Sequence, residues 1–137
     1  WNKIYKASFL KENNILFEEG INFEDNLFFL KAYLNAQNIV FTKVPLYNYR
    51  QNSQTSYSKK GRQDYKKLDF FTLYKLQKKF LKEKNLYKNY KKGYEFSKKQ
   101  ELYYWFNKIE DKFIKLIYGW KLLWHFPLIL RDNFCPV

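Results

Sequence analysis

The chain has one cysteine, no methionine, three prolines and four glycines among its 137 residues. Because Cys135 stands alone, the sequence excludes an internal disulfide and a cysteine-rich metal cluster, and we expect a reducing, cytosolic setting. The longest apolar tract, Leu116 to Leu130, is interrupted by Lys121 and His125 and falls short of the roughly 20 residues that a spanning helix needs. The sequence therefore predicts a cytoplasmic protein, or one held peripherally on the inner face of the plasma membrane.

The N-terminus lacks the basic region and uninterrupted apolar core of a signal peptide. The sequence starts at Trp1, and the absence of methionine indicates a piece of a longer protein whose N-terminal part is missing. We expect two parts, residues 1–58 and a helical extension over residues 59–137.

Positive charge dominates, with 26 lysines and arginines against 13 acids and a formal net charge of +13. Only three of these cations are arginines, namely Arg50, Arg62 and Arg131. Lysine, asparagine, tyrosine, phenylalanine and isoleucine are abundant together, as in proteins of A/T-rich genomes. The charge by itself therefore indicates only a weak, salt-sensitive attraction to polyanions such as anionic membranes.

The first part of the chain predicts a mixture of helices and short strands. A helical turn is expected over residues 8–13 with Ser8 as its cap. From Asn22, apolar residues recur at steps of three and four and predict a largely buried helix. The β-branched and aromatic run 39–42 and the run 46–50 after Pro45 predict two strands, so the fold class expected is α+β and mostly helical.

The polar segment 51–62 has no periodicity and predicts a loop. Beyond it, apolar spacing predicts three helices, over residues 65–81, 86–108 and 112–124. Pro127 is expected to end the last of them. The C-terminal part should therefore be a helical bundle.

Glu24 and Asp25 open the predicted helix and have two interpretations. In the structural one, Asn22 caps the helix and the acids favour its first turn because the helix dipole is positive there. In the functional one, the same placement holds a carboxylate ready to take a proton from a hydroxyl nucleophile. The pair of residues does not separate the two.

Four motifs follow one another in the first part of the chain. Residues 2–10 read Asn-Lys-Ile-Tyr-Lys-Ala-Ser-Phe-Leu, residues 17–25 fit Phe-x-x-Gly-Ile-x-x-Glu-Asp, residues 47–50 read Tyr-Asn-Tyr-Arg, and a loop rich in serine and threonine follows. This order resembles the acceptor-side half of a bacterial family-two glycosyltransferase, over residues 1 to about 58. The resemblance implies a fragment of the glycosyltransferase A α/β fold.

The resemblance also implies roles for individual residues. Asp25 matches the position that such enzymes use as catalytic base, and Glu24 matches its partner. Arg50, together with the loop after it, would reach the diphosphate of the donor. The structural alternative is that Arg50 is only a solvated residue at a strand end. The implied substrate-binding residues are Asn2, Lys3, Arg50, Ser53 and Ser56.

By this resemblance the protein moves a sugar from a nucleotide-sugar donor to a hydroxyl acceptor, with inversion, in the synthesis of cell-surface polysaccharide or glycolipid. The family's divalent metal, Mg²⁺ or Mn²⁺, is bound by an Asp-x-Asp motif. No Asp-x-Asp, glycine-rich phosphate loop or alternating strand and helix pattern occurs in the 137 residues. We therefore expect the metal ligands to lie outside this chain and the chain alone to be inactive.

A second hypothesis is a non-catalytic, basic helical module that docks on an anionic membrane or a partner protein. Residues 115–131 combine tryptophans and leucines with Lys115, Lys121 and Arg131, which is typical of membrane-surface segments, although core packing explains such a pattern more often. His125 has no second ligand at usable spacing, so a role in packing is expected. Nucleic acid is not expected as a partner, because lysine prevails where base readout favours arginine.

Overall fold

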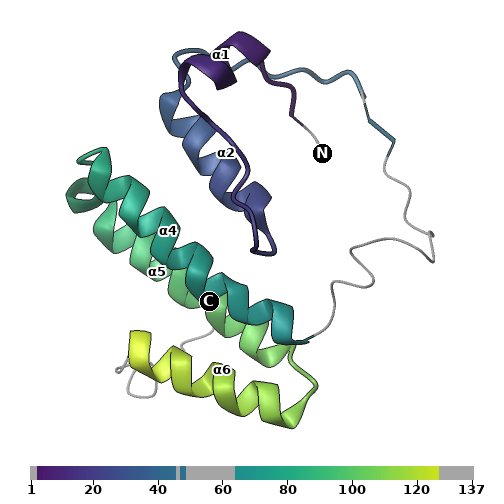
Figure 1. The fold of residues 1–137 in the computed structure, drawn as a ribbon, viewed down its shortest axis with the longest axis vertical. Helices are drawn as coiled ribbons and strands as arrows, with labels where there is room; N and C mark the ends of the chain where they lie inside the picture. Colours follow the sequence, from purple (N-terminus) through teal and green to yellow (C-terminus); the bar gives the residue numbers. More distant parts are fainter. Residues whose placement is uncertain (1–2, 46, 49–63, 127–137) are drawn as a thin grey trace. The chain divides into compact units, whose positions relative to one another are not determined.

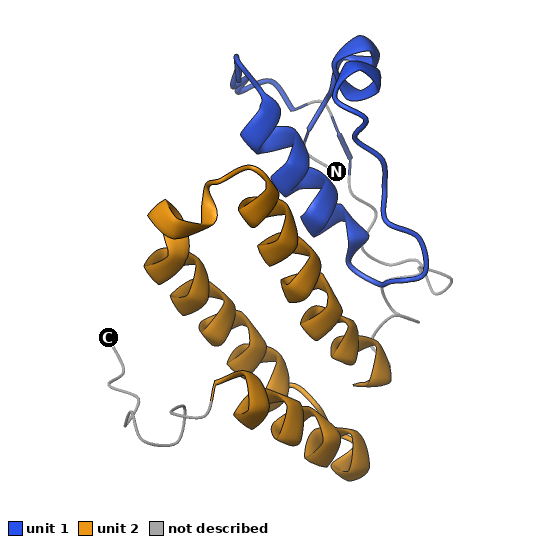
Figure 2. Ribbon diagram, turned by 60° about the vertical axis from the view of Figure 1, so that its left-hand side comes forward, with its two compact units in different colours: residues 1–62 blue, residues 63–137 orange. Residues whose placement is uncertain are grey.

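The computed structural model describes residues 3–45, 47–48 and 64–126. The chain divides into two compact units, residues 1–62 and 63–137, which Figure 2 shows in blue and orange. Their α-helices are labelled in Figure 1. The boundary predicted after residue 58 falls outside the described residues and stays a prediction.

The first unit contains two helices, α1 (Ala7–Glu12) and α2 (Glu24–Asn35). Their shared core consists of Ile15, Phe28 and Ala32, with Tyr5, Phe9 and Leu10 packed against it. Phe28 is central to this core, because the ring of Phe17 stacks on it at 4.1 Å between centroids and the ring of Tyr5 meets it edge-on at 5.3 Å. The predicted helix after Glu24 and Asp25 is present.

Helix α1 begins one residue earlier than predicted and ends in a way that the sequence analysis missed. Lys6, not Ser8, occupies the N-cap position. At the other end Asn14 adopts a left-handed conformation with φ of 49°, and the amide of Ile15 donates to the carbonyl of Leu10 at 2.9 Å. This is the Schellman arrangement, which asparagine accepts more readily than most residues.

The predicted strands are wrong for the part of the chain that the structure describes. The α+β fold class, and the glycosyltransferase A α/β fragment that the resemblance implies, are wrong with them. Residues 39–42 run in irregular structure, and no strand is assigned in the described ranges. Val40 and Phe41 are 91% and 90% exposed, so they lack the pleated, half-buried surface that β-branched and aromatic residues favour in strands. Of the second predicted strand only Tyr47 and Asn48 are described, and they are not in a strand.

The second unit is helical. A 3₁₀ turn, η1 (Asp64–Leu68), leads into α4 (Asp69–Glu83), which is followed by α5 (Tyr87–Asn107) and α6 (Lys112–His125). Helices α4 and α5 lie side by side, and α6 contacts α5 and η1 (Figure 1). The three predicted helices are confirmed within a few residues at their ends, and α6 stops before Pro127, which itself lies outside the described residues.

Aromatic rings join the three helices of this unit. Phe70 of α4 stacks on Trp105 of α5 at 5.0 Å between centroids. Phe71 of α4 meets Tyr118 of α6 at 4.7 Å, and Tyr118 is fully buried. Each such ring contact adds to the area that the helices remove from water, so the high aromatic content builds this core.

A carboxylate fixes the turn before α4 to the loop between α5 and α6. Asp64 accepts hydrogen bonds from the amides of Glu110 at 2.8 Å and Asp111 at 2.6 Å, and from the buried ammonium of Lys67 at 2.6 Å. Lys67 also donates to the carbonyl of Lys108 at 2.6 Å. Burial raises the pKa of Asp64, but these hydrogen bonds outweigh it and the pKa is lowered.

Candidate functional site

The start of α2 is built on two left-handed residues. Gly20 has φ of 77° and Phe23, the N-cap residue, has φ of 64°. The prediction that Asn22 caps the helix is therefore wrong by one residue. A phenylalanine in this conformation is uncommon, since its Cβ crowds the following carbonyl, so the tight turn is held by its surroundings. It places Glu24 and Asp25 in the first turn of α2.

Both acids stand at the positive end of the helix dipole. The side chain of Glu24 is half-buried, and that of Asp25 is exposed. An anion is favoured at this position because the first amides of the helix point toward it. The exposed carboxylate of Asp25 can therefore accept a hydrogen bond from a hydroxyl that reaches the surface of the first unit.

The opening motif lies against the same helix. The ammonium of Lys3 sits 4.5 Å from the centroid of the Phe29 ring, and Tyr5 packs on Phe28. Burial raises the pKa of Tyr5, and the negative charge of Asp25 raises it further. Both ring contacts are with α2, so the opening motif packs against the helix that begins with Glu24 and Asp25.

The other predicted site residues lie outside the described residues. These are Asn2, Arg50, Ser53 and Ser56. Their predicted roles, and those of Glu24, Asp25 and Lys3, stay predictions. The described geometry places Lys3 over the ring of Phe29 in α2, and Glu24 and Asp25 in the first turn of the same helix.

The described residues do not supply a metal site. Nowhere in these ranges do three histidine, cysteine or acidic side chains gather closely enough to hold an ion. Glu24 and Asp25 alone are two neighbouring acids on one turn, whereas Mg²⁺ and Mn²⁺ prefer several oxygen ligands in octahedral geometry. The described residues therefore do not fit the divalent metal that the resemblance implies.

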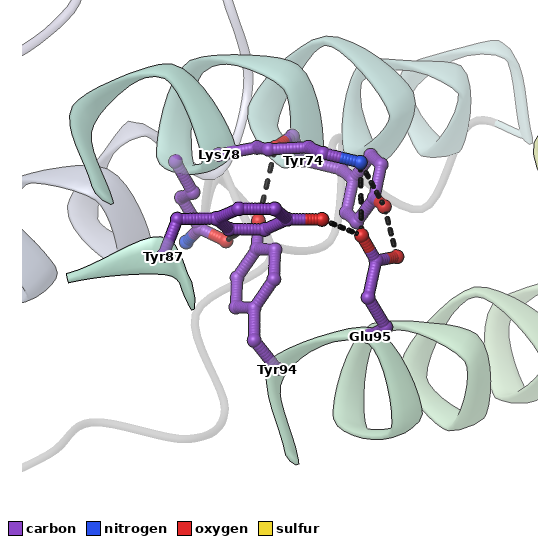
Figure 3. Close-up of polar contacts among 6 residues, drawn as sticks. Tyr74, Lys78, Tyr87, Tyr94 and Glu95 are labelled. Carbon is purple, nitrogen blue, oxygen red and sulfur yellow. Dashed lines mark hydrogen bonds and ion pairs between the residues drawn. The ribbon is translucent and has the colours of Figure 1, made fainter. Parts of the chain in front are cut away.

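A polar cluster that the sequence analysis missed joins α4 to α5. In Figure 3 the side chains of Tyr74, Lys78 and Tyr87 converge on the carboxylate of Glu95. The two phenols donate short hydrogen bonds to it, and the Lys78 ammonium lies 2.8 Å from Oε1 of Glu95. Tyr94 lies beside this group and donates to the main-chain carbonyl of Tyr74 at 3.0 Å.

The protonation states in this cluster are set by burial and hydrogen bonding. Burial raises the pKa of Glu95, but the hydrogen bonds from Lys78, Tyr74 and Tyr87 outweigh it, so the pKa is lowered. Burial raises the pKa of Tyr74, and the carboxylate raises it further. The cluster therefore holds a carboxylate surrounded by protonated donors.

This arrangement fits a role in stability better than a role in chemistry. Both oxygens of Glu95 accept hydrogen bonds from within the cluster, and a carboxylate so engaged is a poor base. The sequence signal was available, because Tyr74 and Lys78 are four residues apart and so lie on one face of α4. What the sequence does not give is the pairing of that face with Glu95.

His125 also has a packing role. Its Nδ1 lies 2.8 Å from the carbonyl oxygen of Lys121, and its ring meets that of Phe71 at 5.1 Å between centroids.

No helix among the described residues is both long enough and apolar enough to cross a membrane.

Comparison with known proteins gives one informative match. No family model matches the chain, and no solved structure matches it. Over 98 residues the chain is 31% identical to a protein of Bacillus subtilis (strain 168) named "Putative glycosyltransferase EpsH". The match covers 67% of this chain and 27% of that protein, so the chain spans about a quarter of its relative's length. The similarity supports a glycosyltransferase relationship for this chain.

Proposed function

We propose that the chain is part of an inverting glycosyltransferase that moves a sugar from a nucleotide-sugar donor to a hydroxyl acceptor, in the synthesis of cell-surface polysaccharide or glycolipid. The observation that carries the proposal is the 31% identity over 98 residues to a protein named as a glycosyltransferase. The order of the four motifs in residues 1 to about 58 supports it independently.

The geometry of the first unit is compatible with an acceptor-side role. Asp25 projects from the first turn of α2, where it is exposed and where the helix dipole favours a negative charge. The Lys3 and Tyr5 side chains lie against the same helix. An acceptor hydroxyl therefore has an exposed carboxylate to donate to, on a helix against which a cation and a phenol also lie.

In the proposed reaction the acceptor hydroxyl donates its proton to a carboxylate oxygen of Asp25. The freed electron pair forms a bond to the anomeric carbon of the donor sugar. The bond between that carbon and the diphosphate oxygen breaks on the opposite side, and the nucleoside diphosphate leaves with the electron pair. Glu24 orients the base, and Arg50 is proposed to reach the departing diphosphate, with Ser53 and Ser56 in the same segment.

The donor-binding half and the divalent metal are proposed to come from sequence outside this chain. The described acids do not fit a metal, and the 137 residues contain no Asp-x-Asp. The chain by itself is accordingly expected to show no transfer.

The test uses the protein that contains this chain together with a donor-binding half. Asp25→Asn keeps the size and the exposure of the side chain but removes its basicity. General-base assistance is worth about 10² to 10⁴ in rate, so kcat should fall by that factor. The measurement is acceptor-dependent release of nucleoside diphosphate across a set of nucleotide sugars.

Glu19→Gln provides the matched control, because Glu19 is another exposed acid of the first unit that lies just before Gly20. It should leave kcat within about twofold of the parent, which is the usual range for a surface change away from a site. If Asp25→Asn also retains full turnover, Asp25 is not the base. If no nucleotide sugar supports release in the parent protein, the glycosyltransferase proposal itself is wrong.

A further inference from the structure

Helix α6 is apolar on two opposite faces. One face packs into the second unit through Tyr118 and Leu122, which are 0% and 4% exposed. Tyr118 there meets Phe71 of α4 and Phe106 of α5. The other face carries five large apolar side chains that are between 36% and 83% exposed: Phe113, Leu116, Trp120, Leu123 and Trp124.

These five residues, which we call the outer face of α6, form one continuous stripe. Their spacing along the helix is three, four, three and one residues. At about 100° per residue, this spacing places all five within an arc of about 100°, roughly opposite Tyr118 and Leu122. A stripe of this kind is normally the buried side of a surface helix. Because it is exposed here, we expect a binding partner or a lipid surface to cover it.

The charges along α6 are all of one sign. The helix contains Lys112, Lys115 and Lys121 and no acidic residue; Asp111, which caps it, lies before its first turn. The side chains of Lys112 and Lys121 are exposed. On the same 100° spacing, Lys112 borders the outer face directly. Lys121 lies between that face and the packed side, with its ammonium 5.9 Å from the centroid of the Phe71 ring. The acids nearest in sequence, Glu110 and Asp111, are at the N-terminal end only.

This combination favours an anionic lipid surface over a protein partner. Tryptophan settles at the depth of lipid headgroups, and lysines beside an apolar stripe reach out to anionic phosphates. A helix with a strong apolar stripe and a cationic border is the usual form of an element that lies in the membrane plane. The chain carries a formal net charge of +13, so long-range attraction to such a surface is also favourable.

We propose that the outer face of α6 docks the protein on an anionic membrane, with Trp120 and Trp124 in the headgroup region. The outer face begins at Phe113, two residues before the segment 115–131 indicated by the sequence, and ends at Trp124. Phe126 is half-buried and its ring lies 5.9 Å from that of Tyr74, so it belongs to the packed side. Residues 127–131 lie outside the described part of the chain. Membrane docking by α6 does not depend on glycosyl transfer, so the two proposals are tested independently.

The test is flotation of the 137-residue chain with vesicles made of phosphatidylglycerol and phosphatidylcholine in equal proportions. Trp120→Ser with Trp124→Ser removes two exposed aromatic side chains without touching the packed face. Tyr90→Ser with Phe96→Ser is the matched control, because those two side chains of α5 are 59% and 64% exposed. Far-UV circular dichroism checks that both double variants keep the helices.

The tryptophan variant should lose roughly tenfold or more in its partition coefficient, since it gives up two large interfacial side chains. The α5 control should stay within about twofold of the parent chain. Equal losses in both variants, or no binding of the parent chain, would overturn the proposal. Loss of a dimer in the tryptophan variant, without any lipid binding by the parent, would also overturn it and assign the face to a second copy.

A second pair of variants tests the role of charge. Lys112→Gln with Lys121→Gln should weaken binding by roughly fivefold for each lysine, because each cation near an anionic surface contributes about 1 kcal/mol. Lys91→Gln with Lys92→Gln, two exposed lysines of α5, should weaken it clearly less. Binding of the parent chain that is equally strong to vesicles of phosphatidylcholine alone would contradict the anionic requirement.

Discussion

Left-handed residues mark the ends of α1 and α4 and the start of α2. Asn14 and Asn85 follow the last turns of α1 and α4, with φ of 49° and 57°. In both places the next amide, of Ile15 or Leu86, reaches back to a carbonyl of the last turn at 2.9 Å. The two asparagines were readable as helix stops, because asparagine tolerates this conformation; Phe23, which takes it at the start of α2, has no such signal.

Replacing Gly20 or Gly93 by alanine should change the free energy of unfolding in opposite directions. Both have open space around the position of a Cβ, but Gly20 has φ of 77° whereas Gly93 lies inside α5. Gly20→Ala should lower the free energy of unfolding by about 1 kcal/mol because of backbone strain alone. Gly93→Ala should raise it by about 0.5–1 kcal/mol because alanine is the better helix former.

Thermal unfolding followed by circular dichroism measures both changes, and each variant serves as the control for the other. Stabilisation by Gly20→Ala would show that the turn before α2 is not the one described. Such a result would also mean that this turn does not hold Asp25 in the position described.

At the scale of the elements, the pair formed by α4 and α5 depends on the Glu95 cluster. Glu95→Gln removes the charge that partners Lys78 and leaves the phenols of Tyr74 and Tyr87 competing for one acceptor oxygen. The free energy of unfolding should fall by about 1–3 kcal/mol, the cost of leaving partly buried polar groups without partners. Tryptophan fluorescence during urea unfolding reports it, since Trp105 stacks on Phe70 at this junction.

Glu83→Gln is the matched control for this change. Glu83 pairs with Lys79 at 3.8 Å on the surface of α4, and both side chains are more than half exposed. Its loss should change the free energy of unfolding by less than about 0.5 kcal/mol. Similar losses in the two variants would show that the Glu95 cluster is no stronger than a surface ion pair.

Acid should weaken the second unit in a predictable direction. The pKa values of Glu95 and Asp64 are lowered in the folded chain, while unfolded Glu and Asp titrate near about 4.3 and 3.9. Between the folded and unfolded values the unfolded chain binds more protons, so falling pH favours unfolding. The stabilisation should be complete above about pH 5 and be lost as the pH falls through the lowered folded values.

Urea unfolding at a series of pH values between about 5 and 2 measures this loss. The double variant Glu95→Gln with Asp64→Asn should start from a lower stability and show a flatter dependence on pH. An unchanged slope in the double variant would mean that other acids control the acid sensitivity.

The helices could be predicted from the sequence because apolar residues recur at the spacing that places them on one face of a helix, and that face packs into the core. The helices over 69–83, 87–107 and 112–125 follow from such spacing, and so does the one that begins at Glu24. The predicted strands were wrong because the residues of the run 39–42 only favour an extended, pleated conformation. A preference becomes a strand only where another strand supplies backbone partners, and the described residues supply none to this run.

The two units of the chain carry different candidate functions. The first unit carries the motifs that resemble a glycosyltransferase, and its structure brings the opening motif against the helix that starts with Glu24 and Asp25. The second unit carries the outer face of α6. The motifs predicted which residues to examine, but the contact of Tyr5 with Phe28 depends on a chain reversal that local spacing does not encode.

The stereochemistry and the rate of sugar transfer, measured together, test the proposed role of Asp25. Nuclear magnetic resonance follows the anomeric configuration of the product formed by the protein that joins this chain to its donor-binding half. If Asp25 is the base of an inverting transfer, the product has inverted configuration, and its formation is lost in Asp25→Asn and kept in Glu19→Gln. A product with retained configuration, or full turnover without the carboxylate of Asp25, would contradict it.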